Sequence, residues 1–140
     1  MTAVDIAERK ARVRAFGSLF IAALTAAVMV AVRRGWNSDF PQGLWLGLLV
    51  GSAVILLPIN RWIRPSSPVV RFLDDEGTRE NRRLSCTLGF WAVIVVALLF
   101  GFASHFEPGI AGEEVGQIVA TAGIASAMVA FAILELRAAR

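Results

Sequence analysis

The densest charge in this sequence lies in an eleven-residue segment, residues 73–83, between two pairs of hydrophobic runs. Charges of both signs give orientation and partner discrimination at a polar interface. Two interpretations stay open: a docking surface for a cytoplasmic protein, or a solvated helix start that only sets orientation. Arg82 and Arg83 are also candidates to hold anionic lipid head groups. The candidate partner-binding residues are Asp74, Asp75, Glu76, Arg79, Glu80, Arg82 and Arg83.

A metal site needs several ligands close together, and the sequence offers one weak set. One imidazole and three carboxylates, those of His105, Glu107, Glu113 and Glu114, lie in and after a glycine-containing turn. A single histidine excludes a bis-histidine haem. We interpret His105 as an interfacial residue and the two later glutamates as the acidic first turn of a helix, where they complement its dipole. We therefore expect no metal and no cofactor.

The sequence also lacks the residues needed for nucleophilic catalysis, phosphate binding and disulfide exchange. Ser66 and Ser67 have no histidine partner and are typical of a turn. The glycines lie inside apolar runs, so no phosphate-binding loop is predicted. Cys86 is the only cysteine, which excludes an internal disulfide and a thiol relay. We expect a non-enzymatic protein.

The composition indicates that lipid is the solvent. Hydrophobic residues make up 56% of the 140 residues and the mean hydropathy is +0.64, both high for a soluble domain. The sequence predicts a single all-α membrane domain, an integral four-helix bundle, with a cytoplasmic loop at residues 64–83. A polar helical lead-in precedes the first span, with Glu8 and Arg12 four residues apart. The predicted spans cover residues 15–32, 44–63, 84–104 and 115–134.

The start of the third span has two interpretations. Gly77 and Thr78 favour a break, with a short surface helix ending there and Thr78 capping the next helix. The alternative is one unbroken helix that runs from the loop into the membrane. We favour the break.

Small residues at every fourth position predict close helix packing in the second and fourth spans. These stripes present more small-residue faces than one bundle needs, so we expect a homodimer. The predicted helix-packing residues are Gly43, Gly47, Gly51, Gly112, Gly116 and Ala120.

Ion-coupled transport normally requires a charged group well inside the bilayer, and the only charge in the predicted spans is Arg61, at the end of the second span. Small multidrug resistance exporters share this size and four-span layout, but they place a glutamate in the middle of the first span, where this chain has residues 22–28. That departure argues against proton-coupled export. A small transporter or channel with a pore between subunits stays the alternative function, with polar lining from Thr25, Ser52, Gln117 and Thr121.

The distribution of Lys and Arg predicts the topology. Twelve of the fourteen lie in the lead-in, in residues 61–83 and in the tail, so both termini and the central loop should be cytoplasmic. Arg33 and Arg34, in the first outer loop, disagree with this rule. The basic residues flank apolar runs instead of forming a patch, so we expect no direct contact with nucleic acid.

The two halves of the chain share a similar order of basic cluster, span, turn and glycine-led span. A tandem duplication of hairpins and simple convergence of hairpins both explain this order.

The order of charges in residues 73–83, at the start of a span, resembles that of small uncharacterised bacterial multi-span membrane proteins. Such proteins are often encoded beside a helix-turn-helix regulator. The resemblance covers about a dozen residues and the four-span layout. It implies a bacterial inner-membrane location and a transcription regulator as the cytoplasmic partner. Together with the residues, it leads us to expect a regulatory or scaffolding subunit whose loop 64–83 binds another protein.

Overall fold

The computed structural model describes residues 3–34, 39–57, 76–104, 106 and 111–138. These residues form four helices and no strand, which confirms the predicted all-α helical bundle. The helices are α1 (Ala3–Arg33), α2 (Asp39–Leu56), α5 (Glu76–Ala103) and α6 (Gly112–Ala138).

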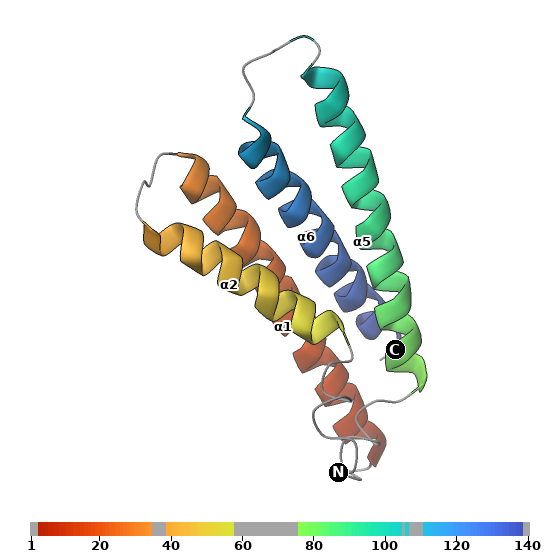
Figure 1. Ribbon diagram of the computed structural model, residues 1–140. Coiled ribbons are helices and arrows are strands. Elements are labelled where there is room, and N and C mark those ends of the chain that lie inside the picture. The colour runs from red at the N-terminus through yellow and green to blue at the C-terminus, as the bar shows by residue number, and fades with distance from the viewer. Residues whose placement is uncertain (1–2, 35–38, 58–75, 105, 107–110, 139–140) are drawn as a thin grey trace.

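Helix α6 is the centre of the bundle. It packs against α5 on one side and against α1 on the other, whereas α2 packs on α1 and on part of α6 (Figure 1). The start of α1, the end of α2, the start of α5 and the end of α6 all lie at the lower end in Figure 1. We call this the basic end, because it carries Arg9, Lys10 and Arg12 of α1 and Arg83 of α5.

Three of the helices are long and apolar enough to cross a membrane, over Glu8–Arg33, Gly77–Ala103 and Gly112–Ala138. The 31 residues of α1 make a helix about 46 Å long, which exceeds a hydrocarbon core of roughly 30 Å. Helix α2 is shorter, with an apolar part at Phe40–Leu56. Residues 58–63, which the sequence assigns to the end of the second span, lie outside the described residues.

The helices begin earlier than the predicted spans. Helix α1 includes the polar lead-in, where Arg12 Nη2 lies 3.5 Å from Glu8 Oε2 as expected. Helix α2 begins at Asp39 and contains Pro41 in its first turn, where a proline removes no helical hydrogen bond. Helix α5 begins at Glu76, so Gly77 and Thr78 are helical and Thr78 is not a cap. The expected break at these two residues is therefore wrong, and α5 runs unbroken into its apolar part.

Two glycines allow a close approach between α5 and α6. A Cβ added to Gly89 would lie 2.8 Å from the carbonyl oxygen of Gly123 and 2.8 Å from the Cβ of Ala127. Only glycine allows the two backbones to come this near. We call this contact the Gly89–Gly123 crossing.

A small apolar core lies between α1, α2 and α6. It consists of Ala22, Leu56, Ala127, Met128 and Phe131, and Cys86 of α5 packs against it as a partly buried side chain.

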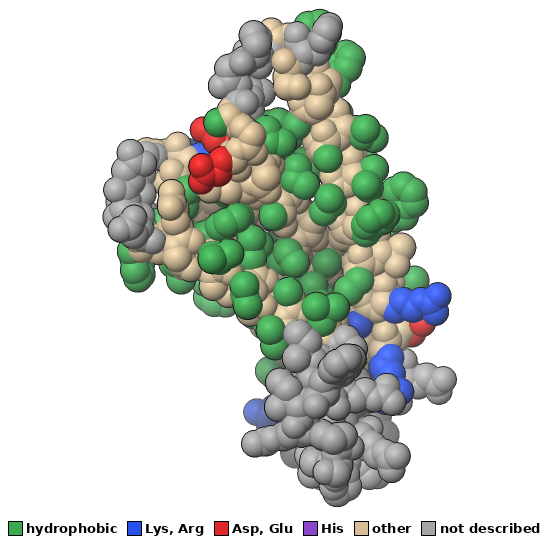
Figure 2. Space-filling model, in the orientation of Figure 1, with side chains coloured by type: hydrophobic (Ala, Val, Ile, Leu, Met, Phe, Trp, Pro, Cys, Tyr) green, Lys and Arg blue, Asp and Glu red, His purple; other side chains and the backbone are tan. Residues whose placement is uncertain are grey.

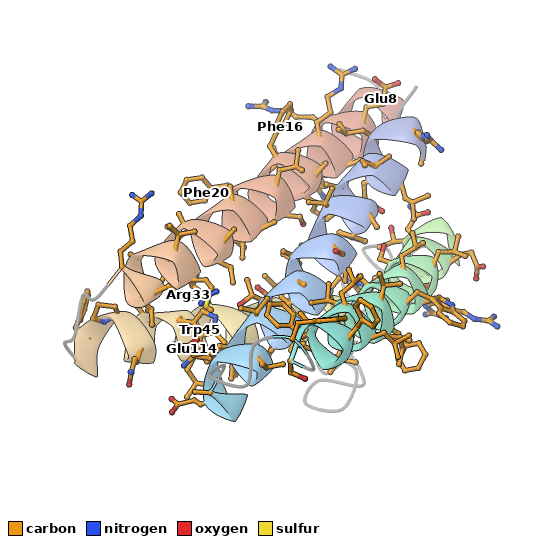
Figure 3. The ribbon with its side chains drawn as sticks, turned by 90° about the horizontal axis from the view of Figure 1, so that it is seen from above. Glu8, Phe16, Phe20, Arg33, Trp45 and Glu114 are labelled. Carbon is orange, nitrogen blue, oxygen red and sulfur yellow. The ribbon has the colours of Figure 1, made fainter. Side chains whose placement is uncertain are left out.

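Large apolar side chains cover the outside of the bundle. Only 6% of the apolar part of α5 is buried, against 33% for α1 and for α6, so α5 is the most exposed of these three helices. Phe16 and Phe20 of α1 point away from α6 (Figure 3). Figure 2 shows the same pattern on one face, with charged side chains near the ends and hydrophobic ones between them.

Candidate functional site

A buried carboxylate joins three helices at the basic end of the bundle. Glu135 of α6 is 2% exposed, and its Oε2 lies 2.8 Å from Nη2 of Arg14 in α1. Its second oxygen, Oε1, accepts a hydrogen bond of 3.1 Å from Nδ2 of Asn81 in α5. Each carboxylate oxygen therefore has a donor from a different helix. We call Arg14, Asn81 and Glu135 the polar clamp.

The clamp corrects one expectation from the sequence. The predicted fourth span stops at residue 134 and contains no charge, but α6 continues to Ala138 and buries Glu135. The sequence does carry a signal for this burial. Met128, Phe131 and Ala132 precede Glu135 by seven, four and three residues, so all four share one helix face, and the other three are core residues.

Small polar side chains accompany the clamp on the inner face of α5. Thr78, Asn81 and Ser85 recur three and four residues apart, and both Thr78 and Ser85 are buried. The Ser85 hydroxyl donates to the carbonyl oxygen of Asn81. Ser18, one turn after Arg14 in α1, is buried as well. The start of α5 therefore has a polar inner face, from which Asn81 bonds to α6.

The candidate partner-binding residues divide into two groups. Arg79, Glu80 and Arg83 are exposed on the first turns of α5, whereas Arg82 is half-buried. Asp74, Asp75 and the side chain of Glu76 lie outside the described residues. We call Arg79, Glu80 and Arg83 the exposed triplet.

The opposite end of the bundle holds an exposed ion pair. Arg33 Nη2 lies 3.3 Å from Glu114 Oε2, and the two side chains are 47% and 50% exposed (Figure 3). Glu113 and Glu114 occupy the first turn of α6, as the sequence predicts. The Arg33–Glu114 pair gives a local reason for a basic residue at this end. His105 and Glu107 lie outside the described residues, and the residues that are described contain no group able to hold a metal ion.

The residues expected to line a pore between subunits lie mostly inside one chain. Thr25 is fully buried and its hydroxyl donates to the carbonyl oxygen of Ile21, 2.7 Å away. Thr121 accepts a hydrogen bond of 2.8 Å from Nε1 of Trp45, which ties α2 to α6. Ser52 is also buried, whereas Gln117 reaches Glu113 on its own helix. Three of the four are therefore enclosed by this chain's own helices.

The predicted glycine stripes do not pack helices together within the chain. A Cβ added to any of their five glycines would meet nothing within 4 Å, and the close approach is made by Gly89 and Gly123 instead. Ala120 is half-buried. Packing of these stripes against a second copy stays a prediction. The open positions are Gly43, Gly47, Gly51, Gly112 and Gly116.

Comparisons with known proteins add no relative. The chain matches no protein-family model, no curated protein and no solved structure.

Proposed function

We propose that this protein is a membrane-embedded regulatory or scaffolding subunit that binds a cytoplasmic protein. The binding surface is the start of α5 together with the preceding part of loop 64–83. The protein provides position and contact and catalyses no reaction.

The observation that carries this proposal is the rigid presentation of the exposed triplet. Arg79, Glu80 and Arg83 stand on a helix that is continuous with an apolar span, so their positions follow those of the bundle. On the inner face of the same turns, Asn81 is bonded to Glu135. A preorganised surface loses little conformational entropy on binding, which favours recognition of a specific partner.

The charge of the triplet indicates the chemistry of the partner. Two guanidinium groups and one carboxylate within five residues suit a surface with a complementary mixture of acids and bases. By the sequence resemblance, we assign this role to a helix-turn-helix transcription regulator held at the inner membrane.

The test replaces the triplet and measures recovery of partners from native membranes. A chain with Arg79→Ala, Glu80→Ala and Arg83→Ala should insert normally but lose the protein that co-purifies with the wild type. The matched control is Glu8→Ala with Arg12→Ala, which removes an exposed pair of charges on α1 instead. Equal recovery of the same protein by the wild type and the triplet variant would refute the docking surface.

One observation favours the alternative function, a small transporter. Glu135 is an ionisable group buried in a membrane-spanning helix, and such groups often bind transported ions or protons. Purified protein in vesicles should then move protons or cations, and Glu135→Gln should abolish the flux while Glu114→Gln preserves it. Absence of flux with the wild type would exclude this alternative.

A further inference from the structure

Two contacts within the long packing of α5 on α6 are of interest here. The first is the Gly89–Gly123 crossing, where an added Cβ would meet the opposite backbone. The second is the hydrogen bond from Asn81 to Glu135, eight residues earlier in α5. Eight residues of helix span about 12 Å, so the two contacts are distinct.

The two contacts differ in kind. The crossing depends on shape, because each glycine leaves room for the other helix. The first eight residues of α5, residues 76–83, contain no large apolar side chain, so hydrophobic packing contributes little to holding them. Their position therefore depends on polar contacts, among which the Asn81 bond reaches another helix.

Glu135 also bonds to Arg14, and this bond links the position of α5 to that of α1. The carboxylate is buried, so it needs both donors in place of water. A displacement of α1 that withdraws Arg14 leaves the carboxylate with one donor fewer and weakens the site as a whole. The contacts of α1 and α5 at Glu135 are therefore energetically coupled.

We propose that the polar clamp is a latch that fixes the start of α5. When it opens, α5 pivots about the Gly89–Gly123 crossing and carries the exposed triplet with it. Movement of α1 opens the latch, and the positions of Arg79, Glu80 and Arg83 change as a result. The consequence for a bound protein rests on the proposed function, whereas the movement itself does not.

The experiment measures the position of α5 in the full chain. Gly17 of α1 and Gly77 of α5 are both exposed, and a Cβ at either meets nothing within 4 Å, so both accept a cysteine and a spin label. Cys86→Ala supplies the cysteine-free background. Pulsed electron paramagnetic resonance in lipid nanodiscs then gives the distribution of distances between the two labels. Gly77 precedes Gly89 by twelve residues, so each 10° of pivot moves its label by roughly 3 Å.

Two variants open the latch from different sides. Asn81→Leu removes the donor on α5, and Glu135→Leu removes the acceptor on α6. Two matched controls alter similar groups elsewhere. Glu114→Leu removes the carboxylate of the exposed Arg33 pair. Thr87→Val removes a hydroxyl of α5 that bonds only within its own helix.

We expect a single narrow distribution for the wild type and for both controls. Asn81→Leu and Glu135→Leu should each shift or broaden it by at least about 3 Å. The exchange of Arg14→Glu with Glu135→Arg should restore the narrow distribution, since the Asn81 amide can accept as well as donate. If Glu135→Leu yields no folded protein, Asn81→Leu alone decides. An unchanged distribution in Asn81→Leu, or an exchange that stays broad, overturns the latch.

Recovery of the partner separates the latch from the proposed function. Asn81→Leu leaves the exposed triplet intact, and we expect it to lower recovery of the co-purified protein several-fold. If recovery is unchanged although the distance has shifted, the link between latch and docking is wrong. If the wild type captures no partner, the proposed function fails. The distances between the two spin labels still test the latch in that case.

Discussion

Arg14 and Glu135 form an unequal ion pair: the arginine side chain is 34% exposed, whereas the glutamate side chain is 3% exposed. The arginine can turn part of its charge toward water when its partner is lost. The glutamate cannot, so it depends on the arginine more than the arginine depends on it.

This inequality predicts the effect of breaking the pair. Arg14→Met keeps an aliphatic side chain at position 14 but leaves the buried Glu135 carboxylate without its cationic partner. We expect it to lower the free energy of unfolding by roughly 2–4 kcal/mol. The double variant Arg14→Met with Glu135→Met should be more stable than Arg14→Met alone, because no buried charge then remains. Denaturant titration in detergent micelles measures both. Arg33→Met, at the exposed pair, is the control and should cost less than about 1 kcal/mol. A double variant less stable than Arg14→Met would contradict the prediction.

The Gly89–Gly123 crossing predicts a strong effect for a single methyl group. Gly89→Ala places a Cβ 2.8 Å from the Gly123 carbonyl oxygen, and backbone cannot rotate away as a side chain would. The helices must separate, at a cost of about 1–3 kcal/mol in the free energy of unfolding. Gly101→Ala, on the same helix but in open space, serves as the control and should be neutral. Equal stability of the two variants would show that α5 and α6 do not meet at Gly89.

The open glycine stripe on α2 predicts an effect on assembly. If two copies pack through this stripe, Gly47→Leu should convert the homodimer to a monomer without loss of helix content. Light scattering coupled to size exclusion measures the mass of the protein in detergent. Gly17→Leu, also at an open position but on α1, is the comparison. A wild-type protein that is already monomeric would refute the homodimer.

The hydrogen bond between Trp45 and Thr121 predicts a modest contribution to the packing of α2. Thr121→Val removes the acceptor at nearly constant volume, and we expect a loss of about 0.5–1.5 kcal/mol. A double-mutant cycle with Trp45→Phe isolates the pair, since Thr121→Val should cost nothing in that background. Thermal unfolding of the four proteins supplies the data. A full cost of Thr121→Val in the Trp45→Phe background would assign the loss to something other than this bond.

The predicted topology can be tested at the two ends of the bundle. Single cysteines at Gly77 and at Glu113, in the Cys86→Ala background, belong to the first turns of α5 and α6, and these two helices start at opposite ends of the bundle. In intact cells, a membrane-impermeant thiol reagent should label the cysteine at position 113 and spare the one at position 77. After the membrane is opened, both should react. The reverse pattern in intact cells would place the basic end outside.

The number and apolar character of the helices follow from the sequence, because long uncharged runs have few structures available in lipid. Helix ends were harder to predict. Gly77 suggested a break that α5 does not have, since a single glycine lowers helix propensity by only about 1 kcal/mol. The same uncertainty placed Glu135 outside the fourth span, although its spacing from Met128 and Phe131 marks the inner face.

Which small residues pack together could not be predicted from spacing alone. The stripe from Gly43 to Gly51 is regular but faces outward, whereas Gly89 and Gly123, which each have only one small residue four positions away, make the close contact. Spacing identifies a smooth helix face, but it does not say which helix will cover it. The candidate partner-binding residues leave out Asn81, but the sequence did not indicate that this amide faces inward and bonds to Glu135.

The positions of the clamp residues along the chain set an order for biogenesis. A ribosome makes Arg14 first, Asn81 later and Glu135 last of the three, so the two donors are made before their common acceptor. The clamp therefore closes only after this part of α6 has been made. A nascent chain stalled before Glu135 would leave the basic ends of α1 and α5 without the carboxylate that joins them.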